Sequence, residues 1–179
     1  MNVARLARAT LVPWLLTAAA LVCGCATAPP ANEDMPWTSG RLSVRVEAYA
    51  EQAARSFSAA FDVRGSGERG ELRLTSPLGM RVATATWAPG VARLNTHEGE
   101  TVFNDLDALA QSALGEALPL AALPDWLAGR PWPNAVSQAT DSGFDQLGWR
   151  LNLSRLAEGF VDAVRTTAPT VTLRARIER

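Results

Sequence analysis

Residues 71–87 read ELRLTSPLGMRVATATW and contain two segments suited to β-strands. Leu72 and Leu74 alternate with charged and hydroxyl residues, a period of two that is typical of a strand with one buried face. Residues 80–87 are rich in threonine and β-branched side chains, which favour a partner strand. The stretch therefore predicts a β-hairpin.

A turn separates the two strands at Ser76-Pro77-Leu78-Gly79. Proline cannot donate to a central ladder and glycine permits positive φ, so Pro77 and Gly79 predict a turn with Leu78 near its tip. An apolar side chain would then lie at a loop position that is usually occupied by a polar residue exposed to solvent. From these residues alone, two alternatives stay open: a leucine folded back onto the core, or a single exposed leucine without a function.

The same alternation of apolar and polar residues recurs along the chain. Strands with one face exposed to solvent are typical of an antiparallel sheet that is covered on one side only. The further segments predicted as strands are 41–49, 57–64, 91–96, 101–103, 149–154 and 171–178.

The middle of the chain has helical periodicity instead. Apolar residues recur at this spacing over 106–118, with Asn104 or Asp105 as the N-cap, and a second short stripe over 120–127 stops at Gly129. These short helices are the predicted lid over the sheet. The lid residues are Leu106, Leu109, Leu114, Leu123 and Trp126.

A large twisted sheet curls, and a curled sheet under a small lid leaves two possibilities for the space between them. The space is either a hollow or a packed core built from the same residues. Periodicity alone does not choose between them.

Residues 1–24 have the features of an export signal. Arg5 and Arg8 precede an apolar run over 9–22 that is short for a membrane span. The four residues that end in Cys25 resemble a bacterial lipobox, in which the cysteine receives a diacylglyceryl thioether and becomes the acylated N-terminus. Cys25 fits better than Cys23, because Gly24 is the small residue needed before the cut. The alternatives are an ordinary secreted protein and an uncleaved anchor.

The predicted organisation has three parts: a removed signal over 1–24, an acylated cysteine with a flexible tether over 25–36, and one domain over 37–179. Ala26 follows the cysteine. In the lipoprotein class that this resembles, an aspartate there favours retention in the inner membrane. Its absence therefore favours the outer membrane.

Composition argues against several classes of function. Loss of Arg5 and Arg8 with the signal leaves 15 basic against 18 acidic residues, a net charge of −3, which is no footprint for nucleic acid. We find no glycine-rich phosphate loop and no metal-ligand spacing, so we expect no cofactor and no metal. The one histidine, His97, lies in a predicted hairpin turn. We expect no enzyme, and a hydrolase that uses His97 is the weakest alternative.

Several stretches together resemble the LolB family of outer-membrane lipoproteins. They run in the family's order over most of the chain, although the family pattern continues to a further tryptophan and this chain stops at Arg179. The stretches are Trp37-x-x-Gly40-Arg41-Leu42-Ser43-Val44, Ser76-Pro77-Leu78-Gly79, Leu114-Gly115, Leu118-Pro119-Leu120, Leu123, Trp126-Leu127, Gly129-x-Pro131 and Gly143-Phe144-x-Gln146-x-Gly148-Trp149.

The resemblance implies a mainly β fold: an incomplete, unclosed antiparallel β-barrel covered by a short α-helical lid, with an apolar cavity between them. It implies a receptor in the outer membrane of a Gram-negative bacterium, on its periplasmic face, that accepts lipoproteins from the periplasmic carrier LolA and inserts them into the membrane. The implied partners are LolA, the acyl chains of client lipoproteins and the inner leaflet of the outer membrane, and we expect a monomer.

The resemblance also implies roles for particular residues. The loop of Pro77, Leu78 and Gly79 would act in releasing the client into the bilayer. The inward-facing residues that we predict to line the cavity are Phe57, Phe61, Leu72, Leu74, Trp149 and Leu151. A second class of function stays open, namely a structural or assembly lipoprotein with a filled core that acts through an edge strand.

Overall fold

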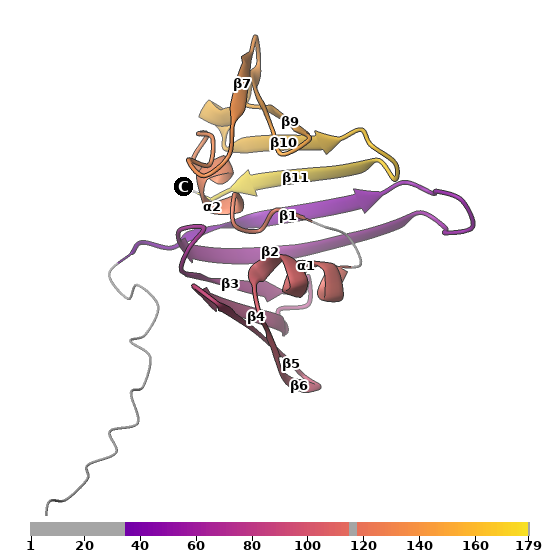
Figure 1. The fold of residues 1–179 in the computed structure, drawn as a ribbon, viewed down its shortest axis with the longest axis vertical. Helices are drawn as coiled ribbons and strands as arrows, with labels where there is room; N and C mark the ends of the chain where they lie inside the picture. Colours follow the sequence, from indigo (N-terminus) through magenta and orange to yellow (C-terminus); the bar gives the residue numbers. More distant parts are fainter. Residues whose placement is uncertain (1–34, 115–117, 179) are drawn as a thin grey trace, which may run out of the picture.

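The computed structural model describes residues 35–114 and 118–178. In this part of the chain, strands form a single antiparallel sheet in the order β6-β5-β4-β3-β2-β1-β11-β10-β9-β8-β7 (Figure 1). The strands are β1 (Thr38–Val46), β2 (Arg55–Gly65), β3 (Gly70–Thr75), β4 (Arg81–Ala88), β5 (Val91–Thr96), β6 (Gly99–Phe103), β7 (Ser137–Thr140), β8 (Gly143–Gln146), β9 (Trp149–Asn152), β10 (Phe160–Arg165) and β11 (Val171–Ile177).

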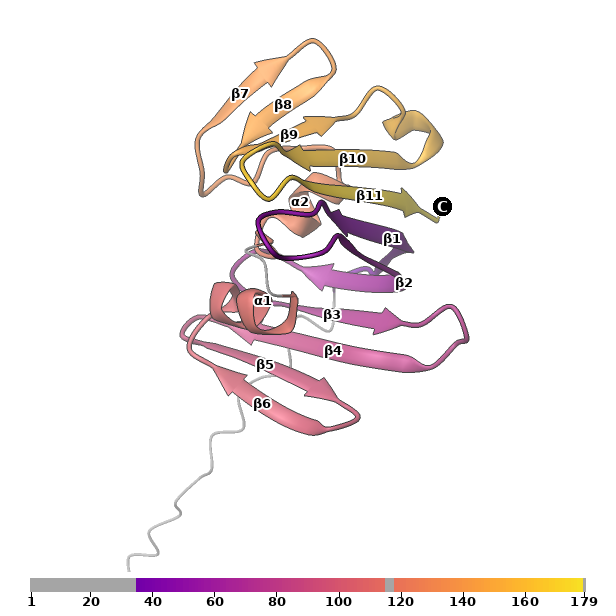
Figure 2. The ribbon, with the colours of Figure 1, turned by 90° about the vertical axis from the view of Figure 1, so that its right-hand side faces the viewer.

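The two ends of the described chain meet in the middle of the sheet. The first strand, β1, pairs with β2 on one side and with the last strand, β11, on the other. Strands β6 and β7 are the two edges, so the curled sheet does not close (Figure 2). The prediction of a mainly β, unclosed antiparallel fold is confirmed.

Two short helices lie against the sheet: α1 (Leu106–Leu114) and α2 (Leu123–Leu127). The Asp105 carboxylate accepts a 2.7 Å hydrogen bond from the Ala108 N–H, so Asp105 rather than Asn104 is the N-cap of α1. Gly129 follows α2 with a φ of 74°. A single 3-10 turn, η1 (Leu156–Glu158), precedes β10. No helix in the described ranges is long and apolar enough to cross a membrane.

The periodic pattern located most strands but not all of them. The strand expected over 41–49 ends at Val46, because Tyr49 and Gln52 exchange backbone hydrogen bonds and Ala50 adopts a positive φ of 50° in the connecting loop. Strands β7, β8 and β10 were not among the predicted segments. The edge strand β7 is polar and exposed, so it carries no alternation to detect.

The concave side of the sheet is filled on one half. The rings of Trp126 in α2 and Trp149 in β9 pack with their centroids 6.1 Å apart. Leu151 and Val161 from the neighbouring strands are fully buried in the same core cluster. Side chains pack closely in this part of the interior, so any cavity must lie under the other half of the sheet.

Candidate functional site

A hollow of about 580 Å³ lies between α1 and the concave face of the sheet. Its walls come mainly from β1 to β5 and from the two helices, and most of the lining residues are aliphatic or aromatic. The polar exceptions lie on the β5–β6 hairpin and on α1: Thr96, Glu98, Thr101 and Ser112. Three of these, Glu98, Thr101 and Ser112, are exposed, so the hollow meets solvent between the hairpin and α1. We refer to this space as the apolar hollow.

The predicted cavity residues divide into two groups. Phe57, Leu72 and Leu74 line the apolar hollow. The other three are not part of its lining: Phe61, Trp149 and Leu151 are 1%, 2% and 0% exposed, inside packed core. All six lie on the inward face of the sheet, but α2 covers the half to which Trp149 belongs.

The predicted lid residues divide in a similar way. Leu109 and Leu123 line the apolar hollow. Leu106 and Trp126 are buried beside it without reaching its surface. The side chain of Leu114 lies outside the described residues. Both helices therefore pack on the sheet side that carries the hollow.

The turn between β3 and β4 presents Leu78 to solvent. Its side chain is 84% exposed, so it is not folded back onto the core. Two backbone hydrogen bonds close the turn, from the Gly79 N–H to the Ser76 carbonyl at 2.9 Å and from the Ser76 N–H to the Met80 carbonyl at 2.8 Å. Gly79 has a φ of 82°, as the turn prediction required. Met80 is also exposed, so two large apolar side chains are open to solvent at this end of the hairpin.

The buried side-chain amide of Gln146 holds α2 in place. The alternation of apolar residues in the sequence does not identify this residue. Gln146 in β8 is 2% exposed. Its side-chain oxygen accepts hydrogen bonds from the Trp126 indole N–H at 2.8 Å and from the Trp132 backbone N–H at 2.9 Å. Its side-chain nitrogen donates to the carbonyls of Trp132 and Ala135 at 2.8 and 2.9 Å. The amide is fully satisfied, and it fastens the helix to the sheet.

A charged cluster holds the start of β1 against β2 and β3. The Glu71 carboxylate accepts hydrogen bonds from Arg64 at 2.7 Å and from Arg73 at 2.6 Å. Both guanidinium groups lie over the Trp37 ring, 4.5 and 4.2 Å from its centroid. Burial raises the pKa of Glu71, but the hydrogen bonds and charges of the two arginines outweigh it, and the net pKa is lowered. The cluster fixes where the chain enters the domain.

His97 lies in the turn between β5 and β6, where the sequence placed it, and its side chain is 85% exposed. Its Nε2 atom is 3.8 Å from a Glu98 carboxylate oxygen. The residues predicted to form the signal and the lipidation site, including Cys25, lie outside the described residues, as does the tether up to residue 34.

The fold and the apolar hollow define a class: unclosed β-barrels that keep an apolar pocket under short helices. Comparison with known proteins agrees at the level of sequence. The family described as "Outer membrane lipoprotein LolB" matches residues 37–175. The chain belongs to this LolB family.

Individual relatives support the assignment. The chain is 35% identical to an "Outer-membrane lipoprotein LolB" of Bordetella petrii, over 79% of this chain and 77% of the relative. It is 35% identical to the protein of the same name in Bordetella pertussis, over 76% and 74%, and 32% identical to that of Chromobacterium violaceum, over 80% and 82%.

Family membership answers two of the sequence predictions. The predicted location is confirmed, because the family is one of outer-membrane lipoproteins. The prediction that the protein is not an enzyme is also confirmed, because the family's role is lipoprotein localisation rather than catalysis.

Proposed function

We propose that this protein is a receptor, anchored in the outer membrane, that accepts lipoproteins from the carrier LolA and inserts them into that membrane. The observation that supports this most is the apolar hollow of about 580 Å³ beneath α1. Pockets that take small ligands usually span roughly 300–1,000 Å³ and are lined mainly by apolar side chains. The acyl chains of a client lipoprotein are the ligand that fits such a lining.

The physical reason for a protein intermediate is the cost of hydrating acyl chains. Each CH₂ group in water costs roughly 0.8 kcal/mol relative to an apolar environment, so ten such groups cost about 8 kcal/mol. A client must therefore stay shielded throughout its passage. Leu72, Leu74 and Phe57 provide part of that shielding here.

Transfer needs no covalent step and no nucleotide. It proceeds if the receptor binds the chains more tightly than the carrier does and the membrane binds them more tightly still, with about 1.4 kcal/mol for each tenfold step in affinity. In this scheme Leu78 contacts the bilayer and promotes departure of the chains, and Pro77 and Gly79 shape its turn.

The N-terminal part supplies the anchor in the same proposal. Residues 1–24 are removed, Cys25 carries the acyl chains, residues 25–36 form the tether and residues 37–179 form the receptor domain. The eleven residues 26–36 span up to roughly 34 Å at about 3.1 Å each when extended. This length lets the domain turn between the carrier and the membrane.

The test is a transfer reaction with purified components. LolA loaded with a radiolabelled client lipoprotein is mixed with this protein in a form that starts at residue 25 and carries Cys25→Ala. We expect the client to move onto the protein, and then into added liposomes. The proposal is wrong if the client stays on LolA at every receptor concentration.

Native mass spectrometry of the same protein separates the second class of function from the first. Co-purifying lipid or fatty acid favours acyl-chain binding. A lipid-free protein that neither accepts clients nor binds fatty acid would favour a structural lipoprotein that acts through protein contacts.

A further inference from the structure

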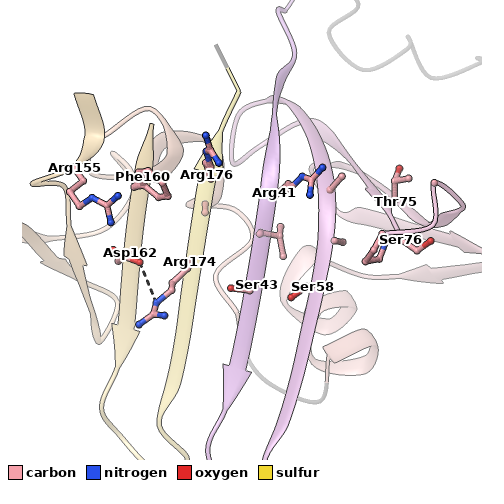
Figure 3. Close-up of a pocket in the computed structure, with 16 residues that line it drawn as sticks. Arg41, Ser43, Ser58, Thr75, Ser76, Arg155, Phe160, Asp162, Arg174 and Arg176 are labelled. Carbon is pink, nitrogen blue, oxygen red and sulfur yellow. Dashed lines mark ion pairs between the residues drawn. The ribbon is translucent and has the colours of Figure 1, made fainter. Parts of the chain in front are cut away.

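A second hollow, of about 860 Å³, lies on the sheet face opposite the helices (Figure 3). Its floor is formed by outward-facing residues of β1, β2, β10 and β11, and one wall is the Ser76, Pro77 and Gly79 part of the Leu78 turn. We refer to this space as the outer hollow. Its charged lining consists of Arg41, Arg155, Arg174, Arg176 and Asp162.

The strand register leads from these arginines directly to the Leu78 turn. Arg176 of β11 lies opposite Arg41 of β1, Arg41 lies opposite Ala60 of β2, and Ala60 lies opposite Thr75 of β3. Thr75 is the residue immediately before the turn. Three strand spacings of roughly 4.8 Å put Arg176 about 14 Å from the turn, and Arg41 one strand closer.

Two of the arginines are not neutralised by acidic neighbours. Arg174 faces Asp162 at 3.6 Å, and Arg155 pairs with Glu158 at 3.1 Å. Across residues 35–114 and 118–178, neither Arg41 nor Arg176 forms an ion pair. Arg176 and Arg155 instead flank the Phe160 ring, 5.6 and 4.0 Å from its centroid. In a chain with a formal net charge of −1, the outer hollow is a concentration of positive charge.

We propose that the outer hollow binds the phosphate headgroups of anionic phospholipids, with Arg41 and Arg176 as its principal contacts. Guanidinium groups suit this ligand, because their fork of donors matches phosphate oxygens. The proposal rests on the proposed function in one respect, namely that the Leu78 turn is the part that touches the membrane.

Continuity with the turn favours lipid over other anionic ligands. Leu78 and Met80 are exposed apolar side chains at the end of a hairpin, and such side chains enter the acyl boundary of a bilayer. Arg41 and Arg176 lie two and three strands from the turn. They reach the headgroup layer, about 5–8 Å thick on each side of the hydrocarbon, when this face of the sheet lies along the membrane surface. Arg81, which pairs with Thr75 at the far side of the turn, is exposed as well and adds to the same field.

The two hollows lie on opposite faces of the sheet, and this has a functional consequence. Ser43 lines the outer hollow and Val44, the next residue of β1, lines the apolar hollow, so the apolar hollow lies behind the arginine-bearing face. Headgroups in the outer hollow do not compete with acyl chains in the apolar hollow. The receptor is therefore able to hold a client while it engages the bilayer.

Vesicle binding tests the proposal. The protein from residue 25 onward with Cys25→Ala keeps every described residue and has no lipid anchor. Its affinity is measured by co-sedimentation with vesicles of phosphatidylcholine alone and of an equal mixture of phosphatidylcholine and phosphatidylglycerol. We expect tighter binding to the anionic vesicles, weakened by added salt.

The decisive comparison is between two double variants with equal change in net charge. Arg41→Gln with Arg176→Gln removes the proposed contacts, and we expect binding to anionic vesicles to fall on the order of 25-fold, about fivefold for each arginine. Arg93→Gln with Arg150→Gln removes two exposed arginines from β5 and β9, outside the outer hollow, and we expect less than a threefold change. Circular dichroism establishes that both variants are folded.

Three results would overturn the proposal. One is equal binding of both double variants to anionic vesicles. Another is binding of soluble glycerol phosphate in the outer hollow with no gain from anionic vesicles. The third is a loss of LolA binding in the Arg41/Arg176 variant with vesicle binding intact, which would make this face a docking site for the carrier. Client uptake from LolA is measured in parallel, so a failure of the proposed function is distinguished from a failure at the outer hollow.

Discussion

The indole N–H of Trp126 donates a hydrogen bond to the side-chain oxygen of Gln146 across 2.8 Å, between residues 20 positions apart in the chain. This bond joins α2 to β8 and brings Trp126 against Trp149. As a result, α2 fills the concave side of the sheet near β8 and β9. The apolar hollow is confined to the part under α1.

The Gln146 amide is the first target for mutation. Gln146→Ala removes four hydrogen bonds: a buried one from the Trp126 indole N–H and three with half-buried backbone groups of Trp132 and Ala135. We expect the free energy of unfolding to fall by about 2–4 kcal/mol, since each unsatisfied buried group costs about 1–3 kcal/mol and relaxation recovers part of it. Urea denaturation measures the change.

The matched control is Gln138→Ala in the exposed edge strand β7, where we expect a change within about 0.5 kcal/mol. Equal effects of the two substitutions would mean that the buried amide does not hold α2.

Leu78→Glu should separate uptake from delivery. The side chain is exposed, so the substitution leaves the fold and its stability within about 0.5 kcal/mol of the original. We expect the variant to accept clients from LolA but to insert them into liposomes at least tenfold more slowly, because a carboxylate resists entry into the acyl boundary.

Val136→Glu is the control for this change, since Val136 is 89% exposed and lies away from the turn. Insertion by Leu78→Glu at the rate of the Val136→Glu variant would remove the role assigned to Leu78.

Filling the apolar hollow should block acyl-chain binding without loss of stability. Ala83 in β4 lines the hollow, and Ala83→Phe places an aromatic ring inside it. We expect binding of a fluorescent fatty acid to weaken at least tenfold, because the ring occupies volume that the chain needs. The unfolding midpoint should stay the same or rise, since the ring replaces empty space with packing contacts.

Ala139→Phe on the exposed face of β7 provides the same substitution away from the hollow and should leave binding unchanged. Full fatty-acid affinity in Ala83→Phe would show that acyl chains bind elsewhere.

The Glu71 cluster predicts a particular dependence of stability on pH. The pKa of Glu71 is lower in the folded protein than its ordinary value of 4.5, because the hydrogen bonds from Arg64 and Arg73 outweigh the effect of burial. A carboxyl group with a lowered pKa contributes stability that is complete above 4.5 and is lost as the pH falls through the folded-state value. The protein should therefore lose this contribution in acid.

Glu71→Gln tests this contribution. At pH 7 we expect the variant to be less stable by about 1.5–3 kcal/mol, the usual contribution of a hydrogen bond to a charged group. The two proteins should converge in stability as the pH falls through the lowered pKa of Glu71, since the Glu71 carboxyl then becomes protonated in the original as well. The exposed Glu51→Gln should show no such convergence, and parallel curves for Glu71→Gln would contradict the assignment.

Several structural features could be predicted from short stretches of sequence, because their physical causes act between residues close in the chain. The Pro77 and Gly79 turn follows from the backbone limits of those two residues, and Gly79 indeed has a positive φ. The start of the first helix was placed at Asn104 or Asp105, and the structure shows Asp105 capping a donor only three residues away. The alternation in β1 and β2 follows from the period of a strand.

Other features have causes that are distant in the chain. Strand β7 has no pattern of its own and exists because β8 offers it an edge. Strand β10 buries only Val161 and the small Ala163, and the apolar Phe160 and Val164 on its other face obscure the alternation. The strand forms because it pairs with β9 and β11. The importance of Gln146 depends on Trp126 and Trp132 arriving beside it, which no local spacing predicts.

Phe57 and Phe61 show what the sequence pattern determines and what only tertiary packing determines. Both lie on the inward face of β2, four residues apart, and the alternation of this strand was enough to place them there. Phe61 is 1% exposed in packed core beside Gly40, whereas Phe57 lines the apolar hollow. Alternation reports which side of a sheet a residue faces. Whether that side is packed or hollow depends on where α1 and α2 lie on the sheet. Contacts between residues distant in the sequence determine those positions.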